Sequence, residues 1–577
     1  MARSSAREMP WGRGTGAGHG SLRGTDVLHQ SPQFEGRFGR MFRTLPASNF
    51  DANDLRELAL KGMTAEPEVV KDEAREPVRD KNGHLIPRAT SEHKIDDEEN
   101  FGIPAGYTYL GQFIDHDITF DPASSLQRQN DPEALVDFRT LRLDLDCLYG
   151  RGPADQPYMF ERDGLHFALG RDLRRDDKPS KTKDLPRFNG RALIGDKRND
   201  ENVIISQLHG VFLRFHNVMA DELKKHSAKI TFEDVQRLVR WHYQWIVLHD
   251  FLPKIVGCDI LHEVLPHLKD STSIYKHKPE LHFYHWKNEP FMPIEFAAAA
   301  YRFGHSMVRP LYRLNTELGS GASKDEIGRG VAGRRFIFAA VQAQGLNGFR
   351  EFPVEWAIDW SLFFELNSKL DDPANRGPHR VQPTYKIDSS LVNPLAFLPE
   401  FSQEIEPGGD LKTDDDGHPL PKPEEISNLA YRNLLRGVSM RLPSGQTVAR
   451  YMGLDPIPDE ELKVGKANVA GLKENKCILH FGESFKGNAP LWFYILAEAQ
   501  HTWAQEAIKK PGSDEEKNKI HVRLGPVGAR IVTEVLVGLL LGDSHSFLSQ
   551  WPNWKPWYMN DKGDFGMPEL IKATGLS

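Results

Sequence analysis

Apolar residues recur every three or four positions along several long segments of the chain, which is the spacing of one face of an α-helix. Ile204, Leu208 and Phe212 begin one such stripe, in a helix expected over about residues 203–225. Alternation of apolar and polar residues, the mark of a strand, is scarce. The other expected helices cover residues 51–64, with Asp51 as the expected N-cap, and residues 232–256, 295–307, 428–436, 445–452, 490–509 and 524–542. We therefore predict a mainly α fold with long loops and very little β structure.

Segments without this spacing divide the chain. Residues 1–45 are rich in Gly, Arg and Ser and have no period, so we expect a flexible tail. Residues 65–100 are polar and interrupted by proline, which predicts an extended connector. Residues 402–424 are acidic and rich in Pro and Gly, which predicts a surface loop. We expect residues 46–577 to form one large domain.

Composition and charge exclude several classes of protein. The 73 basic residues are outnumbered by 81 acidic ones, giving a net charge of −8, so nucleic-acid binding is not indicated. The longest apolar helix, expected over residues 531–541, is too short to span a bilayer. No apolar signal segment is visible at the N-terminus, so we expect a cytoplasmic protein, with non-classical export left open. The three cysteines have neither a disulfide framework nor a zinc spacing.

The first candidate for chemistry is the stretch of residues 107–121. His116 stands between Asp115 and Asp117, and Gln112 lies four residues earlier, on the same face of a helix as His116. The neighbours of these polar residues are apolar, which is unlike a solvated surface turn. A lone His-Asp pair is more often a helix end whose acids cap the backbone, so the interpretation depends on the rest of the chain.

Three further segments offer polar groups on apolar elements. Arg198 and Glu201 are three residues apart, as are Asn433 and Arg436, and His305 follows an Ala-rich apolar segment. Taken singly, Arg198 and Glu201 would more often form a surface ion pair. His305 alone would more often be a core histidine with satisfied hydrogen bonds. Together, two remote histidines, an arginine and two acids fit a haem site. One histidine would bind iron, and the other would act as acid and base on peroxide beside the cationic arginine.

Other histidines give weaker signals. His209 and His216 lie seven residues apart on one expected helix, a spacing compatible with a metal. Because no third ligand accompanies them, we interpret them as packing or hydrogen-bonding residues.

Three motifs carry a resemblance to a known family. Gly-Gln-Phe-Ile-Asp-His-Asp (111–117), Gly-Asp-Lys-Arg-Asn-Asp-Glu-Asn (195–202) and Tyr-Arg-Phe-Gly-His (301–305) resemble the animal-type haem peroxidase family, part of the peroxidase–cyclooxygenase superfamily. The ordered likeness extends over roughly residues 95–555, and the few cysteines make the chain more similar to bacterial members. The resemblance implies a large helical catalytic domain. It also implies a peroxidase that reduces hydrogen peroxide and oxidises a small donor through an oxoferryl intermediate.

The resemblance assigns roles on both sides of a haem b. His116 matches the distal acid–base histidine, Arg198 the distal arginine, and Gln112 a glutamine that holds water or a halide above the iron. His305 matches the proximal iron ligand, and Asn433 matches the asparagine that hydrogen-bonds the other nitrogen of that ligand.

Four more residues match groups that hold the haem. Arg302 and Arg436 match arginines that pair with its propionates, although a plain surface role stays open for both. Asp115 and Glu201 match acids that form ester links to haem methyl groups in mammalian members; whether they do so here is open.

The resemblance also implies a calcium site. Asp117 matches the family's calcium ligand. The set is completed by Thr140, the carbonyl of Arg142, Asp144 and Asp146. Hard oxygen donors at alternate positions suit Ca²⁺. Asp146 replaces the serine usual in the family. The alternative is an acidic surface strand.

Two departures from the family bear on the substrate. Asn202 stands where one mammalian member has a methionine linked to haem, which favours iodide, bromide, thiocyanate or phenols over chloride as the donor. The main alternative is a fatty-acid dioxygenase of the cyclooxygenase-like branch, whose radical tyrosine lies three residues before the proximal histidine. Here Tyr301 lies four before His305, which favours a peroxidase. A haem protein without catalysis is a third possibility. The sequence does not reveal the donor or the oligomeric state.

Overall fold

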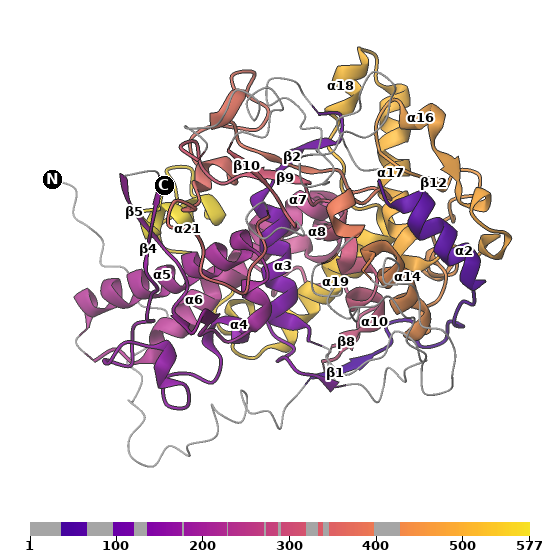
Figure 1. The fold of residues 1–577 in the computed structure, drawn as a ribbon. Helices are drawn as coiled ribbons and strands as arrows, with labels where there is room; N and C mark the ends of the chain where they lie inside the picture. The colour runs from indigo at the N-terminus through magenta and orange to yellow at the C-terminus, as the bar shows by residue number, and fades with distance from the viewer. Residues whose placement is uncertain are drawn as a thin grey trace, which may run out of the picture.

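The computed structural model describes a mainly helical chain with short strands (Figure 1), as the spacing of apolar residues predicted. One cluster of buried hydrophobic residues runs from Phe38 to Leu576 and includes side chains from every long helix. No helix in the described part is both long and apolar enough to cross a membrane. The described residues are 36–65, 96–120, 136–175, 178–227, 229–269, 273–286, 290–318, 333–338, 345–396, 398 and 427–576.

The α-helices begin where capping residues follow polar loops. Asp51 caps α2 by accepting from the backbone N–H of Asn53 and Asp54, as expected. Asn202 caps α5, and Thr231 with Asp234 forms a capping box at α6. The α-helices are α2 (Ala52–Glu57), α3 (Gly106–Ile118), α4 (Asp146–Tyr149), α5 (Val203–His226), α6 (Phe232–Ile246), α7 (Leu252–Val256), α8 (Cys258–Val264), α9 (Pro266–Lys269), α10 (Ile294–Ala297), α14 (Leu429–Ser439), α15 (Gly445–Tyr451), α16 (Gly471–Glu474), α17 (Leu491–Lys509), α18 (Asp514–Asn518), α19 (Pro526–Gly542), α20 (Phe547–Gln550) and α21 (Met567–Thr574).

Tighter and wider helical turns join these helices. The π-helices are η2 (Leu58–Met63) and η6 (Val247–Phe251). The 3₁₀ turns are η4 (Pro157–Met159), η5 (Lys197–Asp200), η7 (Ala300–His305), η9 (Trp360–Leu362), η10 (Gly377–His379), η11 (Asn393–Ala396), η12 (Ile478–His480) and η13 (Glu483–Phe485).

The strands pair into small separate sheets. The sheet with three strands has the order β3-β1-β8, with β1 antiparallel to β3 and parallel to β8, and Phe38 opposite Met292. The two-stranded sheets are β10-β9, β11-β2, β12-β13, β4-β5 and β6-β7. The strands are β1 (Gly36–Gly39), β2 (Glu99–Pro104), β3 (Val136–Asp137), β4 (Asp172–Arg175), β5 (Lys178–Lys183), β6 (Arg187–Phe188), β7 (Arg191–Ala192), β8 (Met292–Pro293), β9 (Leu311–Arg313), β10 (Arg334–Phe336), β11 (Pro383–Tyr385), β12 (Lys463–Val464) and β13 (Lys476–Cys477).

The long helices pack around α3 and α19 (Figure 1). Helix α3 contacts α5, η5 and η7, and α5 contacts α6 and α21. Helix α19 is apolar on nearly all sides, and it lies against α7, α8, α10 and α17. This packing brings η5 and η7, which are far apart in sequence, into contact with α3.

The structure differs from the sequence predictions at the N-terminus. Residues 1–35 of the predicted tail lie outside the described part, but residues 36–45 are packed. Gly36 fits β1 because a side chain there would lie 2.7 Å from Leu141 Cγ, and the Glu295 carboxylate accepts from the N–H of Met41 and Phe42. Some of the glycines that suggested flexibility are instead positions where the backbone packs closely against a neighbouring side chain. The predicted connector and the acidic loop fall largely or wholly outside the described residues.

Three predicted helices are divided. The helix expected over residues 51–64 consists of α2 followed by the π-helix η2. The helix expected over residues 232–256 consists of α6, η6 and α7 in succession. The prediction of a single helix over residues 295–307 was wrong. It breaks at Ala299, whose φ of −137° and ψ of −73° are not helical, and continues as the 3₁₀ turn η7. His305 therefore ends a short turn and is not carried by a long helix.

Candidate functional site

A cavity of about 720 Å³ is lined by side chains from α3, η5, η7 and α14, among other elements. Its volume is within the range of pockets that hold drug-sized ligands or cofactors. Of the residues that the resemblance assigns to a haem site, all but Asn433 line this cavity. They are Gln112, Asp115, His116, Arg198, Glu201, Arg302, His305 and Arg436.

His116 is a neutral imidazole at the wall of this cavity. Its Nδ1 lies 2.8 Å from Oδ1 of Asn199, and the ring is 5% exposed. Burial, together with the nearby Arg198 cation, lowers the pKa of His116 to about 3. Because the amide oxygen accepts, the hydrogen of the neutral ring lies on Nδ1, and Nε2 keeps its lone pair.

Arg198 is oriented by Asp196 and by the end of α3. Its Nε and Nη2 donate to the Asp196 carboxylate, and Nη2 also donates to the carbonyl oxygens of His116 and Thr119, at 3.1 and 2.6 Å. Burial alone would raise the pKa of Asp196, but the Arg198 cation holds this pKa below its usual range. Nη1 is the end of the guanidinium that these bonds leave unused. The Phe120 ring lies 4.7 Å from the guanidinium carbon.

Gln112 and Glu201 meet across the cavity wall. The amide nitrogen of Gln112 donates to a carboxylate oxygen of Glu201. Asn202, the next residue, has its side-chain oxygen occupied by the N–H groups of Ile204 and Ile205 at the start of α5. Its position therefore serves helix capping as well as the cavity lining.

Asp115 is one turn from the end of α3. Thr119 donates to its carboxylate at 3.0 Å, and also to its carbonyl oxygen. Burial raises the pKa of Asp115, against the opposing effect of the cations Arg198 and Arg302. The carboxylate therefore lies in a setting that favours its neutral form more than water does.

His305 is linked to Arg302 through Asn433. The amide nitrogen of Asn433 lies 2.8 Å from Nδ1 of His305, and its oxygen accepts from Nη1 of Arg302 at 2.7 Å. A guanidinium can only donate, so it fixes which end of the amide faces each neighbour. Burial lowers the pKa of His305 to about 3, with Arg302 adding to the effect. With Nδ1 accepting, the hydrogen of this neutral ring lies on Nε2.

The predicted calcium ligands cluster behind α3. Carboxylate oxygens of Asp117, Asp144 and Asp146 all lie within 4.8 Å of one another. Thr140 donates from its hydroxyl to Asp144 at 2.8 Å and from its N–H to Asp146 at 3.1 Å. The side chain of Arg142 forms an ion pair with Asp543, which lies outside the cluster.

The charge in this cluster is only partly compensated. Burial, together with the neighbouring Asp144, raises the pKa of Asp117 to about 7. Oδ1 of Asp117 is buried, and no described residue donates a hydrogen bond to it. Burial also raises the pKa of Asp144 and of Asp146. Converging buried carboxylates with a free oxygen fit a hard cation.

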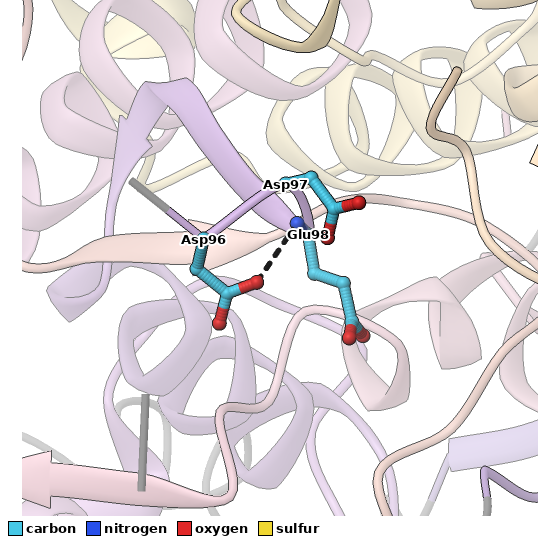
Figure 2. Close-up of side chains that lie close together, drawn as sticks. All are labelled: Asp96, Asp97 and Glu98. Atoms are coloured by element: carbon cyan, nitrogen blue, oxygen red, sulfur yellow. Dashed lines mark hydrogen bonds between the residues drawn. The ribbon is translucent and has the colours of Figure 1, made fainter. Parts of the chain in front are cut away.

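Figure 2 shows a second group of three carboxylates, Asp96, Asp97 and Glu98. None of the three lines the cavity. Asp96 accepts from the N–H of Glu98 at 3.1 Å. Glu98 pairs with Lys466, and Asp97 accepts from the amide of Asn468 at 2.9 Å. These acids have partners within the protein, so we assign them no cation.

The cavity fits a flat macrocycle that carries acidic groups. Gly304, next to His305, lines it, and a side-chain carbon added at this glycine would meet no atom within 4 Å. The wall beside the imidazole is thus bare. Arg302 and Arg436 supply cations on the η7 and α14 side, while His116 and Arg198 are on the α3 and η5 side. Haem, which is flat and carries acidic propionates, would fit this set of donors and charges.

Comparison with known proteins agrees with this class. The family model for animal haem peroxidase matches residues 131–330, which include Arg198, Glu201 and His305. The match covers about a third of the chain and identifies this part as an animal haem peroxidase domain.

Relatives share limited identity with the chain. Mouse thyroid peroxidase is 32% identical over 131 residues, and dog thyroid peroxidase is 27% identical over 203 residues. These matches cover 22% and 32% of this chain but only 13% and 20% of those proteins. The solved structure of peroxidase A from Dictyostelium discoideum has 15% identity and a TM-score of 0.46, over 88% of this chain and 93% of that one.

Two groups at the site were not found from the sequence as functional residues. Asn199 was passed over because it lies between the more conspicuous Arg198 and Glu201, and Asp196 because it resembles a loop acid. His209 was interpreted as a packing or hydrogen-bonding residue, and it lies 3.0 Å from the amide nitrogen of Asn199. A turn that directs consecutive side chains to different partners leaves no periodic signal.

Proposed function

We propose that this protein is a haem-dependent peroxidase, which reduces hydrogen peroxide and oxidises a small donor. The observation that carries the proposal is that two buried imidazoles from separate elements, His116 and His305, line one cavity together with Arg198. One imidazole would bind iron and the other would handle protons, a division of labour that a peroxidase requires. Bound haem would supply the electron transfers to peroxide and from the donor.

The residues on the η7 and α14 side would hold the haem. Nε2 of His305 is the proposed iron ligand, and Arg302 and Arg436 are the proposed partners of the propionates. If a haem carboxylate accepted from Arg302 in place of Asn433, the amide of Asn433 could rotate. Its oxygen would then accept from Nδ1–H of His305. That exchange frees Nε2 of His305 for the metal.

Asp115 and Glu201 are the acids proposed to attach haem covalently. Each ester would join a carboxylate oxygen to a methyl carbon with loss of two electrons and two protons. Hydrogen peroxide, reduced to two waters, is the oxidant that balances this step. The raised pKa of Asp115 and the hydrogen bond between Gln112 and Glu201 support their placement beside the ligand.

The residues of α3 and η5 would act on peroxide. Nε2 of His116 would take a proton from one peroxide oxygen and return it to the oxygen that leaves as water. Arg198 would stabilise negative charge that develops as the O–O bond breaks, using the Nη1 end that its other bonds leave unused. Gln112 would hold water or a halide ion in the same space.

The donor that we propose is iodide, bromide, thiocyanate or a phenol, and chloride is disfavoured. The reason is that Asn202 cannot form the sulfonium link that withdraws electrons from haem. Its side-chain oxygen is also held by the first turn of α5. We also propose Ca²⁺ at Asp117, Thr140, Asp144 and Asp146, with Arg142 contributing its carbonyl. Such an ion would fix the end of α3 that carries His116.

The test is the optical spectrum of the purified full chain before and after addition of hydrogen peroxide, with turnover of iodide and of a phenol. Extraction of the pigment into acidified acetone tests the ester links. His305→Ala should abolish stable haem binding. His116→Ala should keep the pigment and slow the reaction with peroxide by about 10²–10⁴-fold. A His116→Ala protein as fast as the parent would contradict the proposal.

The alternative is a fatty-acid dioxygenase that uses a tyrosine radical. One observation favours testing it: Tyr301 lines the same cavity, and its buried hydroxyl has no hydrogen-bond partner among the described residues. Oxygen uptake with a long-chain fatty acid, lost in Tyr301→Phe while peroxide turnover is kept, would support this alternative. No oxygen uptake would exclude it.

A further inference from the structure

Asn199 joins the two buried histidines His116 and His209 through a single amide. Its oxygen lies 2.8 Å from Nδ1 of His116, and its nitrogen lies 3.0 Å from Nδ1 of His209. Asn199 and His209 are fully buried, and His116 is nearly so. Hydrogen bonds among buried groups are not exchanged for bonds to water, so this arrangement is fixed by the protein.

The turn that carries Asn199 holds His116 at two points. Arg198, the preceding residue, donates to the carbonyl oxygen of His116 at 3.1 Å, while Asn199 contacts its ring. Asp196 caps this turn by accepting from the N–H of Arg198 at 2.8 Å. Consecutive residues of η5 therefore fix the backbone and the ring orientation of the same histidine.

The two ends of an amide differ, so its orientation decides where each ring carries its hydrogen. The oxygen can only accept, which puts the hydrogen of His116 on Nδ1 and leaves Nε2 free. The nitrogen can only donate, which makes Nδ1 of His209 the acceptor. Turning the amide over would reverse both rings at once, and Nε2 of His116 would then carry hydrogen and could not accept a proton.

We propose that Asn199 is the positioning residue that sets the tautomer of His116, and that His209 anchors the amide in the orientation that this requires. This inference rests on the proposed function, because a base at Nε2 is what the reaction with peroxide needs. A buried carboxylate would orient a histidine in a similar way but add a charge. An amide selects the tautomer and leaves the ring neutral.

His209 is suited to act as the anchor because α5 holds it rigidly. Its ring is packed edge-on against Phe113 of α3, with centroids 6.0 Å apart. The packing therefore holds the ring with Nδ1 facing the amide of Asn199. The seven-residue spacing of His209 and His216 thus separates two roles, since His216 bonds to Tyr149 and to the carbonyl of Leu165.

Asn199→Leu removes the amide and tests the tautomer directly. The measurement is the infrared C–O stretch of the ferrous carbon monoxide complex of the full-length haem protein. In the parent, Nε2 of His116 has no hydrogen to donate to carbon monoxide. In Asn199→Leu, the Nε2–H form becomes accessible, and a band at lower wavenumber should appear. The rate constant with hydrogen peroxide should fall by about 100-fold, the low end for a general base.

A second pair of variants tests the anchor without touching Asn199. His209→Gln keeps an oxygen that can accept from Asn199, whereas His209→Leu keeps none. We expect the carbon monoxide band of the parent in His209→Gln and the shifted band in part of the His209→Leu molecules. His216→Gln is the matched control, since His216 is equally buried on the same helix, and it should leave band and rate unchanged.

The outcomes separate this inference from the proposed function. If the parent reacts with peroxide and His116→Ala does not, but Asn199→Leu has the band and rate of the parent, the inference is overturned alone. A slow Asn199→Leu with an unshifted band also overturns it, because the loss is then not one of tautomer. Equal bands in His209→Gln and His209→Leu overturn the anchoring role. A parent chain without peroxide turnover overturns the proposed function instead.

Discussion

The amide nitrogen of Asn433 faces Nδ1 of His305, whereas at His116 it is an amide oxygen that faces Nδ1. The difference arises because Nη1 of Arg302 donates a hydrogen bond to the oxygen of Asn433 at 2.7 Å. His305 is thus held with its hydrogen on Nε2 as long as Nη1 of Arg302 donates to the oxygen of Asn433. Binding of an anionic group to Arg302 and coordination of a metal by His305 are therefore coupled through one side chain.

Substitutions of Asn433 should separate haem retention from the electronic effect of this bond. Asn433→Leu leaves Nδ1 of His305 without a partner, and haem affinity should fall by about 10–100-fold. Asn433→Asp offers an acceptor in any rotamer. It should keep haem and lower the reduction potential of the iron, because a carboxylate draws the Nδ1 proton away from the ring. Haem titration and potentiometry measure the two effects, and an unchanged potential in Asn433→Asp would contradict the coupling.

The periodic parts of the molecule could be predicted from the sequence. The apolar stripe of α5 and the cap at Asp51 appear in the structure nearly as expected. The break at Ala299 could not be predicted, because alanine favours helix and the interruption comes from tertiary packing. Glycines at 36 and 39 suggested a tail, since a sequence does not reveal which backbones approach closely.

The candidate site divides in the same way. His116, Arg198 and His305 belong to motifs, and the structure brings them to one cavity. Asn199 and Asp196 support two of them through hydrogen bonds that depend on three-dimensional packing. Such supporting residues have no spacing rule, so sequence reasoning finds the groups that contact a ligand more readily than those that orient them.

Removal of calcium should destabilise the chain and slow its reaction with peroxide. The cation would neutralise Asp117, Asp144 and Asp146, and Asp117 directly follows His116 on α3. At a calcium concentration 100 times its Kd, chelation should lower the free energy of unfolding by about 2.7 kcal/mol. Calorimetry with and without a chelator measures this loss. Asp144→Asn should abolish the response. Asp97→Asn, in the other carboxylate cluster, should keep it, and equal responses of the two variants would contradict the assignment.

Filling the space at Gly304 should block the ligand without unfolding the protein. The added side chain of Gly304→Val would point into the cavity, where no protein atom lies within 4 Å of its first carbon. We expect haem affinity to fall more than tenfold, with the unfolding free energy of the haem-free protein changed by about 0.5 kcal/mol or less. Gly304→Ala is the smaller control and should bind haem more tightly than Gly304→Val. Unchanged affinity in Gly304→Val would show that haem binds elsewhere.

Glu498 should make the stability of the protein fall between about pH 5 and pH 7. Its carboxylate is buried on α17 and accepts from the N–H groups of Val527 and Gly528 at the start of α19. Burial raises its pKa from 4.5 to about 7, so the folded state keeps a proton that the unfolded state has released. The contribution of the protonated acid is complete below pH 4.5 and is lost as pH rises through 7.

Glu498→Gln lacks this titration, so its stability relative to the parent should increase by about 2 kcal/mol between pH 5 and pH 8. Denaturant unfolding of both proteins at each pH gives the difference, in which the other titrating groups cancel. Glu506→Gln, at an exposed site on the same helix, should follow the pH dependence of the parent. A difference between Glu498→Gln and the parent that stays constant with pH would mean that Glu498 is ionised in the folded protein throughout this range. Its bonds to α19 would then outweigh the cost of burying the charge.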